Sequence, residues 1–237
     1  MIKTVKTKLN SHICYPENDS IVGQALENDR IWEEPLIKRG LGLIGTGDVI
    51  DCGAYIGTHS IEWARKAKQV YSFEPVALSY KLLELNVLLN GLENVQTRKM
   101  GLFHGPDNGF LEISKPDIHN EVSNLAHASC LEDGEHKISE KCLFVSLDAE
   151  LERSNHSNEI DLIKIDCEGM EYEVLQGAAK TIGHHKPHII MEYNQQYQKN
   201  FEKMDCFLTD IGYEFVEWVE GGYGEIVRDK LWSHRNK

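Results

Sequence analysis

The chain has 237 residues, of which 41% are hydrophobic and 27% are charged, and its formal net charge is −13. This size and composition are typical of a soluble globular protein with one substantial domain. The acidic balance argues against a nucleic acid as the main partner, because binding to a phosphate backbone depends on clustered lysine and arginine. No run approaches the ~20 apolar residues of a membrane span, and the N-terminal residues lack the apolar core of a signal peptide. We therefore expect a cytoplasmic protein with no membrane partner.

The first region of the chain is residues 1–47, which we expect to form a helical N-terminal cap, because two short apolar-periodic stretches end at Gly40. From residue 48 to residue 237 the pattern changes to strands that alternate with helices. We predict strands over 48–52, 69–73, 94–100, 160–166, 187–192, 213–218 and 225–231, separated by helices over 58–67, 76–90, 146–153, 170–182 and 197–211.

Residues 102–145 are less regular and are interpreted as an insertion in this second region. Two hypotheses remain open for the insertion: it forms a hairpin that shapes a binding pocket, or it is a plain surface excursion.

Alternating strands and helices predict a doubly wound α/β fold with a mostly parallel sheet, because each crossover helix covers one face of the sheet. The last two strands are separated only by a glycine-rich turn, so we expect them to pair antiparallel at one edge. Ligands of such sheets bind beyond the carboxyl ends of the strands. Four acids fall at strand ends and are expected along this rim: Asp51, Glu74, Asp166 and Glu192.

The first rim site is the segment VIDCGAYIGTHS, residues 49–60, which has the pattern of a strand, a tight glycine turn and a helix. Gly53 and Gly57 would let the backbone approach a ligand, although an ordinary turn is the alternative. Asp51 would repel a pyrophosphate and attract a cation. S-adenosylmethionine fits this preference because it has no phosphate and carries an ammonium and a sulfonium. Glu74, at the end of the next strand, can accept hydrogen bonds from both ribose hydroxyls.

Several segments resemble the FkbM-type methyltransferases, which are class I enzymes that use S-adenosylmethionine. The resemblance covers residues 48–195 and rests on the segments VIDCGAYIGTHS, VYSFEP, LNVLLNGLENV, LIKIDCEGMEYEVLQGA and PHIIMEYN. It implies a Rossmann-like, seven-stranded sheet with an antiparallel edge strand, a methyltransferase domain over residues 48–237, and methylation of an oxygen, commonly a sugar or polyketide hydroxyl.

The resemblance also implies which residues bind the cofactor. They are the loop residues Asp51, Gly53, Ala54, Gly57 and Thr58, the ribose acid Glu74, Asn90 after the next helix, and Gly101 with Leu102 beside the adenine. Two positions depart from the family pattern. Gly101 and Leu102 stand where an alanine–leucine pair is usual, and Tyr55 replaces an asparagine of the glycine loop.

The second rim site is formed by Lys164, Asp166 and Glu168, which alternate along a strand end and therefore point to the same side. We interpret them as catalytic residues. Asp166 is best placed to orient or deprotonate an acceptor, and Glu168 to hydrogen-bond it. Lys164 is either kept neutral by burial or stays charged and pairs with the acids. The alternative is a purely structural cluster of a lysine and two carboxylates.

We therefore expect an S-adenosylmethionine-dependent methyltransferase, EC 2.1.1.-, that acts on a hydroxyl of a sugar, a glycan or a small metabolite. The alternatives are a non-catalytic S-adenosylmethionine-binding module and a nicotinamide-dependent dehydrogenase. Asp51 and the missing third glycine of the dinucleotide motif disfavour the dehydrogenase. We predict no metal, neither at the HHKPH segment, residues 184–188, nor at Asp166, Glu168 and Glu192, although three carboxylates could hold a divalent cation.

Overall fold

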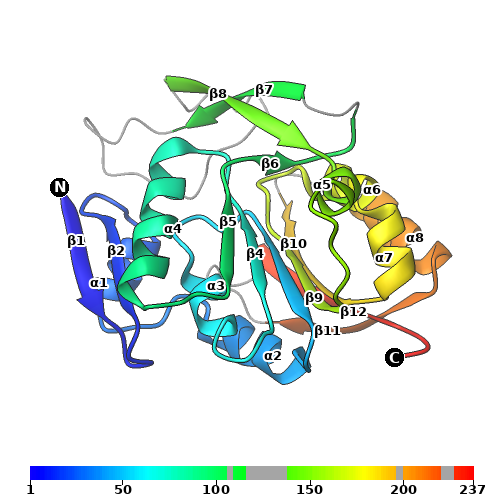
Figure 1. Cartoon of the computed structure of the whole chain (residues 1–237), viewed down its shortest axis with the longest axis horizontal. Helices are drawn as coiled ribbons and strands as arrows, with labels where there is room; N and C mark the ends of the chain where they lie inside the picture. The colour runs from blue at the N-terminus through cyan, green and yellow to red at the C-terminus, as the bar shows by residue number, and fades with distance from the viewer. Residues whose placement is uncertain (106–108, 116–137, 196–199, 220–226) are drawn as a thin grey trace.

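The computed structural model describes residues 1–105, 109–115, 138–195, 200–219 and 227–237, and a seven-stranded sheet forms its centre (Figure 1). Its strands are β3 (Asp48–Cys52), β4 (Val70–Phe73), β5 (Val95–Arg98), β9 (Ile160–Ile165), β10 (His188–Asn194), β11 (Tyr213–Val219) and β12 (Val227–His234). Their order is β11-β12-β10-β9-β3-β4-β5, so the direction of winding reverses between β3 and β9. The rim next to this reversal is where open α/β sheets bind ligands.

The middle strands are parallel and buried on both faces, as the alternating pattern predicts. Every residue of β3 is buried, and β9 is buried from Leu162 to Ile165. The helices that connect or cover the strands are α3 (Thr58–Trp63), α4 (Ala77–Leu89), α5 (Leu147–Arg153), α6 (Glu171–Gly177), α7 (Ala179–His185) and α8 (Phe201–Asp210). The mostly parallel, seven-stranded α/β sheet is confirmed, because helices on both faces keep these strands away from water.

The antiparallel strand is not at the edge, which corrects one detail of the expected sheet. β11 and β12 do pair antiparallel, but β12 lies between β11 and β10 and is antiparallel to both. Burial explains this order. Leu231 and Trp232 of β12 are 0% and 4% exposed, whereas the middle of β11 is exposed and contains a bulge. The bulged strand is therefore the one that takes the open edge, although it exposes Phe215, Val216 and Trp218.

The N-terminal region begins with a hairpin that the sequence analysis did not anticipate. β1 (Ile2–Lys6) pairs with β2 (His12–Pro16), and only then do α1 (Val22–Glu27) and α2 (Glu34–Leu43) follow. The expected N-terminal cap therefore contains two helices, but its first part is a β-hairpin and not helical. Figure 1 shows the hairpin beside α4, and Ile13, Cys14 and Tyr15 of β2 are buried in a cluster with residues of α3 and α4.

Two asparagines one turn apart on α4 fasten β2 to the helix. Asn86 accepts a hydrogen bond from the backbone N–H of Cys14 at 2.6 Å and donates one to its carbonyl at 3.0 Å. Asn90 does the same for His12, at 2.9 and 2.7 Å. The rise of about 6 Å over four helical residues nearly matches the rise of about 6.8 Å over two strand residues. The two side-chain amides thus hydrogen-bond to the backbone of β2 much as a neighbouring strand would.

Residues of the N-terminal region share a core with the main sheet. Leu36 and Ile44 pack in the same buried cluster as Val49 and Trp63, and a Cβ at Gly40 would lie 2.4 Å from the Trp63 ring. The N-terminal helices are therefore held in place by contacts with the sheet, and their residues have a fixed position relative to its rim.

A second, three-stranded sheet occupies the described part of the expected insertion. Its strands are β6 (Gly101–Leu102), β7 (Gly109–Lys115) and β8 (Ile138–Val145), in the order β6-β8-β7. β7 and β8 pair antiparallel, and Figure 1 shows them beyond the end of α4 at the top of the view. Residues 106–108 and 116–137 of the insertion lie outside the described residues. Over the part of the chain that the structure describes, none of the helices has the length and apolar character needed to cross a membrane.

Candidate active site

A pocket opens at the rim where the winding of the sheet reverses. It is lined by the loops that follow β3, β4 and β9, by β6, β7 and β8 of the small sheet, by β10, and by Trp32 and Glu33 of the N-terminal region. Its empty space, counted to the open mouth, is about 1050 Å³.

The loop after β3 is shaped around Gly53. Its φ of +77° favours glycine, and a Cβ there would lie 1.8 Å from the carbonyl oxygen of Asp166. The backbone N–H groups of Gly53 and Ala54 both donate to the carbonyl of Phe73, at 3.1 and 2.9 Å. Gly53 and Ala54, both expected to bind the cofactor, line the pocket.

Tyr55 has a φ of +50°, a left-handed conformation in which asparagine is enriched and a bulky residue is unusual. Its backbone N–H donates to Glu74 at 3.0 Å, and its hydroxyl donates to Asp19 at 2.8 Å. The second bond, to the N-terminal region, holds the tyrosine in this conformation and explains how the chain tolerates it at the position where the family has asparagine.

Glu74 lies at the end of β4 and lines the pocket, as expected of a ribose-binding acid. The side chain is 6% exposed, and each carboxylate oxygen accepts one backbone hydrogen bond, from Val76 at 2.8 Å and from Tyr55 at 3.0 Å. These two bonds fix the plane of the carboxylate. Burial raises the pKa of Glu74 to about 8, although the two backbone donors oppose the change.

Asp51 does not line the pocket, in contrast to the expectation of direct cofactor contact. It is 0% exposed, and one oxygen accepts a hydrogen bond from Ser60, whose hydroxyl is also bonded to Ser72 at 2.7 Å. Its other oxygen lies 3.6 Å from the ammonium nitrogen of Lys164. Because β9 is the direct neighbour of β3, this acid faces the lysine, and it affects the pocket by its charge, which also helps to raise the pKa of Glu74.

The remaining predicted cofactor residues divide into two groups. Thr58, Gly101 and Leu102 line the pocket, and the space for a Cβ at Gly101 is filled by the ring of Phe144. Gly57 and Asn90 do not. At Gly57, with a φ of +88°, a Cβ would lie 2.6 Å from Leu83, so this glycine is required by packing against α4.

Asn90 is misassigned as a cofactor residue, because it caps the end of α4 that is farther from the rim. Its amide is occupied by His12 of the hairpin and by the carbonyl of Asn86.

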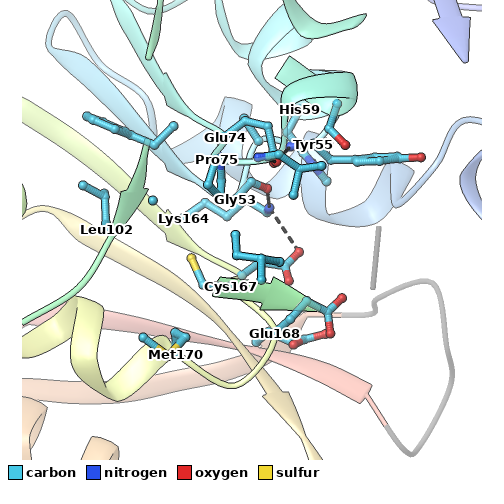
Figure 2. A pocket seen from close by; sticks show the side chains of 18 of the residues that line it. Gly53, Tyr55, His59, Glu74, Pro75, Leu102, Lys164, Cys167, Glu168 and Met170 are labelled. Carbon is cyan, nitrogen blue, oxygen red and sulfur yellow. Dashed lines mark hydrogen bonds and ion pairs between the residues drawn. The ribbon is translucent and has the colours of Figure 1, made fainter. Parts of the chain in front are cut away.

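Lys164 is the central charge of the site. Its side chain is 2% exposed, and its nitrogen lies 3.1 Å from Asp166 and donates to the carbonyl of Gly53 at 3.3 Å. Figure 2 shows it between Gly53 and the loop of Cys167 and Glu168. Burial lowers the pKa of Lys164, but the carboxylates of Asp166, Asp51 and Glu33 more than offset this and hold it well above its ordinary value. Of the two hypotheses for Lys164, the geometry therefore favours a charged lysine that pairs with the acids.

The loop after β9 presents Asp166 and Glu168 to the same pocket. Glu168 has a φ of +51° and Gly169 a φ of +96°, and Glu171 closes the loop by accepting bonds from the backbone N–H groups of Cys167 and Gly169. Burial, followed by the charge of Asp166 and then that of Glu171, raises the pKa of Glu168 well above its ordinary value. The structure thus brings Lys164, Asp166 and Glu168 to one pocket, although Glu168 lies in a turn and not on the extended strand that the alternation assumed; their catalytic role stays a prediction.

Sequence reasoning missed several residues of the site. Trp32 and Glu33 come from the N-terminal region, and His59 from the first turn of α3; all three line the pocket. His59 Nε2 lies 3.1 Å from a carboxylate oxygen of Glu33, whose own φ is +47°. His59 follows the glycine loop closely and could have been suspected from that position, whereas nothing in the sequence connects Glu33 with residues of the sheet.

One further acid, Glu192 of β10, lines the pocket. Asp229 of β12, which is not among the lining residues, lies directly opposite Glu192 in the antiparallel register. Among the described residues, no three histidine, cysteine, aspartate or glutamate side chains are arranged to hold a metal ion. At the HHKPH segment, His188 bonds to Ser233 at 2.7 Å, and it begins β10, at the end of the strand opposite the pocket.

Comparison with known proteins identifies the family. Residues 51–215 match the model of the methyltransferase FkbM domain. The methyltransferase sdnD of Sordaria araneosa is 28% identical over 213 residues, which cover 76% of this chain and 80% of that protein.

Solved structures agree in fold. The methyltransferase FkbM of Methylobacillus flagellatus KT superposes with a TM-score of 0.55 at 16% identity; the match covers 81% of this chain, which spans 45% of that protein. The putative transferase PH0793 of Pyrococcus horikoshii gives a TM-score of 0.53 at 14% identity and covers 98% of this chain and 70% of that protein. At these identities the likeness concerns the fold alone, whereas the family model spans more than half of the chain. The chain therefore belongs to the FkbM methyltransferase family.

Proposed function

We propose that this protein is an S-adenosylmethionine-dependent methyltransferase that methylates a hydroxyl of a small molecule or a glycan. The observation that carries the proposal is the arrangement of one pocket with two chemically different sides. Gly53 and Glu74 form a side suited to a nucleoside, and Lys164, Asp166 and Glu168 form a side suited to an acceptor. The sdnD relative, which is named a methyltransferase, supports the reaction class.

The residues present fit the proposed cofactor. Glu74 offers a carboxylate with a fixed plane to the ribose hydroxyls, and Gly53 and Ala54 line the pocket beside it. Gly101 and Leu102 provide an apolar wall for the adenine. The acids of the pocket would repel a pyrophosphate, so they favour a cationic cofactor over NAD. When bound, S-adenosylmethionine would supply a methyl group on a positively charged sulfur.

The chemistry left to the protein is to orient the acceptor, exclude water and remove a proton. A lysine that stays charged does not act as a base, so we assign Lys164 to holding Asp166 and the Gly53 loop in place. Asp166 then orients the acceptor hydroxyl. Glu168, on the same side of the pocket, takes the proton in its ionised form.

One pair of measurements tests the proposal against its alternatives. Isothermal titration with S-adenosylmethionine and with NAD separates a methyltransferase from a dehydrogenase, and binding of NAD alone would contradict the proposal. Transfer of a labelled methyl group, screened over glycans, hydroxylated metabolites and proteins, separates an enzyme from a non-catalytic binding module. Binding without transfer to any acceptor class would favour the module.

We propose further that the acceptor is not a nucleic acid and that the protein acts in the cytoplasm. The support for the first point is the net charge of −13 and the acidic lining of the pocket. A submicromolar interaction with DNA or RNA that weakens steeply with salt would contradict it. The cytoplasmic location rests on the sequence and stays a prediction.

A further inference from the structure

Glu192 and Asp229 form a buried acid pair beside the pocket. They are direct partners in the antiparallel register of β10 and β12, so their side chains leave the same face of the sheet with Cβ atoms about 5 Å apart. The residues are 9% and 4% exposed. Like charges directly opposite each other destabilise a pair of strands, so an arrangement of this kind calls for a compensating positive charge.

The described part of the protein does not supply that charge by direct contact. Neither acid forms an ion pair with a lysine, arginine or histidine of the described residues; the contacts of Lys164 go to Asp166 and Asp51. The Oε2 atom of Glu192 is buried and has no hydrogen-bond partner. Glu192 lines the pocket and is about nine-tenths buried, so its carboxylate lies at the wall of the cavity with one oxygen, Oε2, enclosed and unpaired.

The acid pair lies on the acceptor side of the pocket. The strand order β4-β3-β9-β10-β12 places Glu192 two strands from β3, or about 10 Å from the glycine loop, and Asp229 one strand farther. Lys164 and Asp166 stand between the glycine loop and the pair, on β9 and the loop after it. A ligand group at the pair would therefore belong to the molecule that receives the methyl group.

We propose that the acceptor carries a protonated amine that the Glu192–Asp229 pair binds, while a hydroxyl of the same molecule faces Asp166 and Glu168. This inference rests on the proposed function and narrows the substrate to hydroxylated amines, such as amino sugars and amino alcohols. A buried pair of carboxylates keeps the amine protonated, so its lone pair is unavailable and it serves as an anchor. A lone pair of the hydroxyl oxygen forms the new O–CH₃ bond, the electrons of the broken C–S bond remain on sulfur as a neutral thioether, and the hydroxyl proton passes to Glu168.

The titration behaviour of the pair agrees with this geometry. Burial, and then the charges of Asp166, Glu168, Glu171 and Asp229, raise the pKa of Glu192 well above its ordinary value.

Asp229 behaves in the same way. Burial, and then the charges of Glu33 and Asp166, raise its pKa, while Lys164 acts in the opposite direction. Without a bound cation the pair therefore retains protons that a cation would displace. Binding of the amine should release protons and should strengthen as the pH rises, as long as the pH stays below the pKa of the amine itself.

The test uses the full chain saturated with S-adenosylhomocysteine, so that the nucleoside side of the pocket is filled. Matched probes are titrated by calorimetry: D-glucosamine against D-glucose, and 2-aminoethanol against ethylene glycol. We expect each amine to bind about tenfold or more tightly than its neutral partner, the scale of a hydrogen bond to a charged group. Glu192→Gln and Asp229→Asn should each remove most of this preference.

The exposed Glu93, which precedes β5 at the opposite end of the strands, provides the matched control. Glu93→Gln removes one negative charge from the protein and should keep the preference for amines. Thermal melting distinguishes a binding role from a structural one, because removing one of two opposed charges should keep or raise the melting temperature of the unliganded protein. A melting temperature lowered by both Glu192→Gln and Asp229→Asn would indicate that the pair serves the fold, and would overturn the inference.

Two other outcomes separate the inference from the proposed function. If wild-type protein binds S-adenosylhomocysteine but neither amine binds more tightly than its neutral partner, the amine site is overturned and the methyltransferase proposal stands. Loss of S-adenosylhomocysteine affinity in Glu192→Gln would assign the acid to the nucleoside and overturn the inference as well. Failure of the wild-type protein to bind S-adenosylhomocysteine at all would overturn the proposed function itself.

Discussion

The ammonium nitrogen of Lys164 lies 3.1 Å from a carboxylate oxygen of Asp166, two residues farther along the chain. The same nitrogen lies 3.6 Å from the buried Asp51 and is bonded to the carbonyl of Gly53. One lysine thereby connects the loop after β3 with the loop after β9, that is, the side of the pocket assigned to the cofactor with the side assigned to the acceptor. The charge of Lys164 therefore helps to hold both loops in place.

Replacing this lysine by an apolar residue should therefore destabilise the protein. Lys164→Met leaves Asp51 buried without its cation, and breaking a buried ion pair costs about 3–5 kcal/mol of unfolding free energy. Urea unfolding measures the loss, with the exposed Lys81→Met as the matched control. A loss below about 1 kcal/mol, accompanied by a fall in turnover, would instead assign the lysine to proton removal.

Glu74 should govern the affinity for S-adenosylmethionine. Glu74→Ala is expected to weaken binding by about 1–3 kcal/mol, the scale for hydrogen bonds to a charged group. Because ribose hydroxyls donate to the ionised carboxylate and the pKa of Glu74 is raised to about 8, affinity should increase as the pH rises through that value. Titration calorimetry at several pH values measures the effect. Glu74→Gln should abolish the part of the pH dependence that comes from Glu74 and leave the part that comes from titration of the ligand. Equal pH dependence in the wild type and in Glu74→Gln would refute the ribose assignment.

Asp166 and Glu168 should be needed for methyl transfer but not for binding of the cofactor. Asp166→Asn and Glu168→Gln are each expected to keep the fold and most of the affinity for S-adenosylmethionine, while single-turnover methyl transfer falls by about 10²-fold or more. A conservative Asp166→Glu variant tests whether the position of the carboxylate matters as well as its charge. Wild-type turnover in both Asp166→Asn and Glu168→Gln would mean that these acids serve only the fold.

The acids around the pocket should make the unliganded protein less stable as the pH rises. Burial is the main cause of the raised pKa values of Glu168, Glu171, Glu192 and Asp229. A carboxyl with a raised pKa in the folded state binds more protons than in the unfolded state, so its stabilising contribution is complete below the unfolded pKa and is lost as the pH rises through the folded one.

For Glu171, whose pKa rises from 4.5 to about 7, this loss is on the order of 3 kcal/mol across that interval. Melting temperatures measured from about pH 5 to pH 8 should fall progressively, and Glu192→Gln should flatten the dependence. A melting temperature that increases over this range would show that these carboxyl groups are ionised in the folded protein.

The sequence by itself determined the elements of the central sheet and much of the rim. Strand 48–52 agrees residue for residue, and the parallel strands were predictable because burial on both faces leaves continuous apolar runs. Lys164 and Asp166 could be placed together because side chains two residues apart on an extended chain share a face, whereas Glu168 reaches the same pocket through a turn in which its φ is +51°. Glu74 was also correctly placed at the rim, because the end of a strand and the loop that follows it are local features of a sequence.

Only the tertiary structure decided which rim acids reach the pocket and what joins them from elsewhere. Asp51 ends its strand at the rim, yet the lysine of the neighbouring strand stands between it and the cavity. Asn90 has the spacing of a cofactor residue but bonds to a hairpin whose docking depends on contacts more than 70 positions apart in the chain. Glu33 joins the pocket lining from the N-terminal region, and Asp229, near the C-terminal end of the chain, lies beside Glu192. Local periodicity in the sequence indicates the direction in which a side chain points. Which residue it meets depends on packing between distant segments, and the local pattern contains no information about that packing.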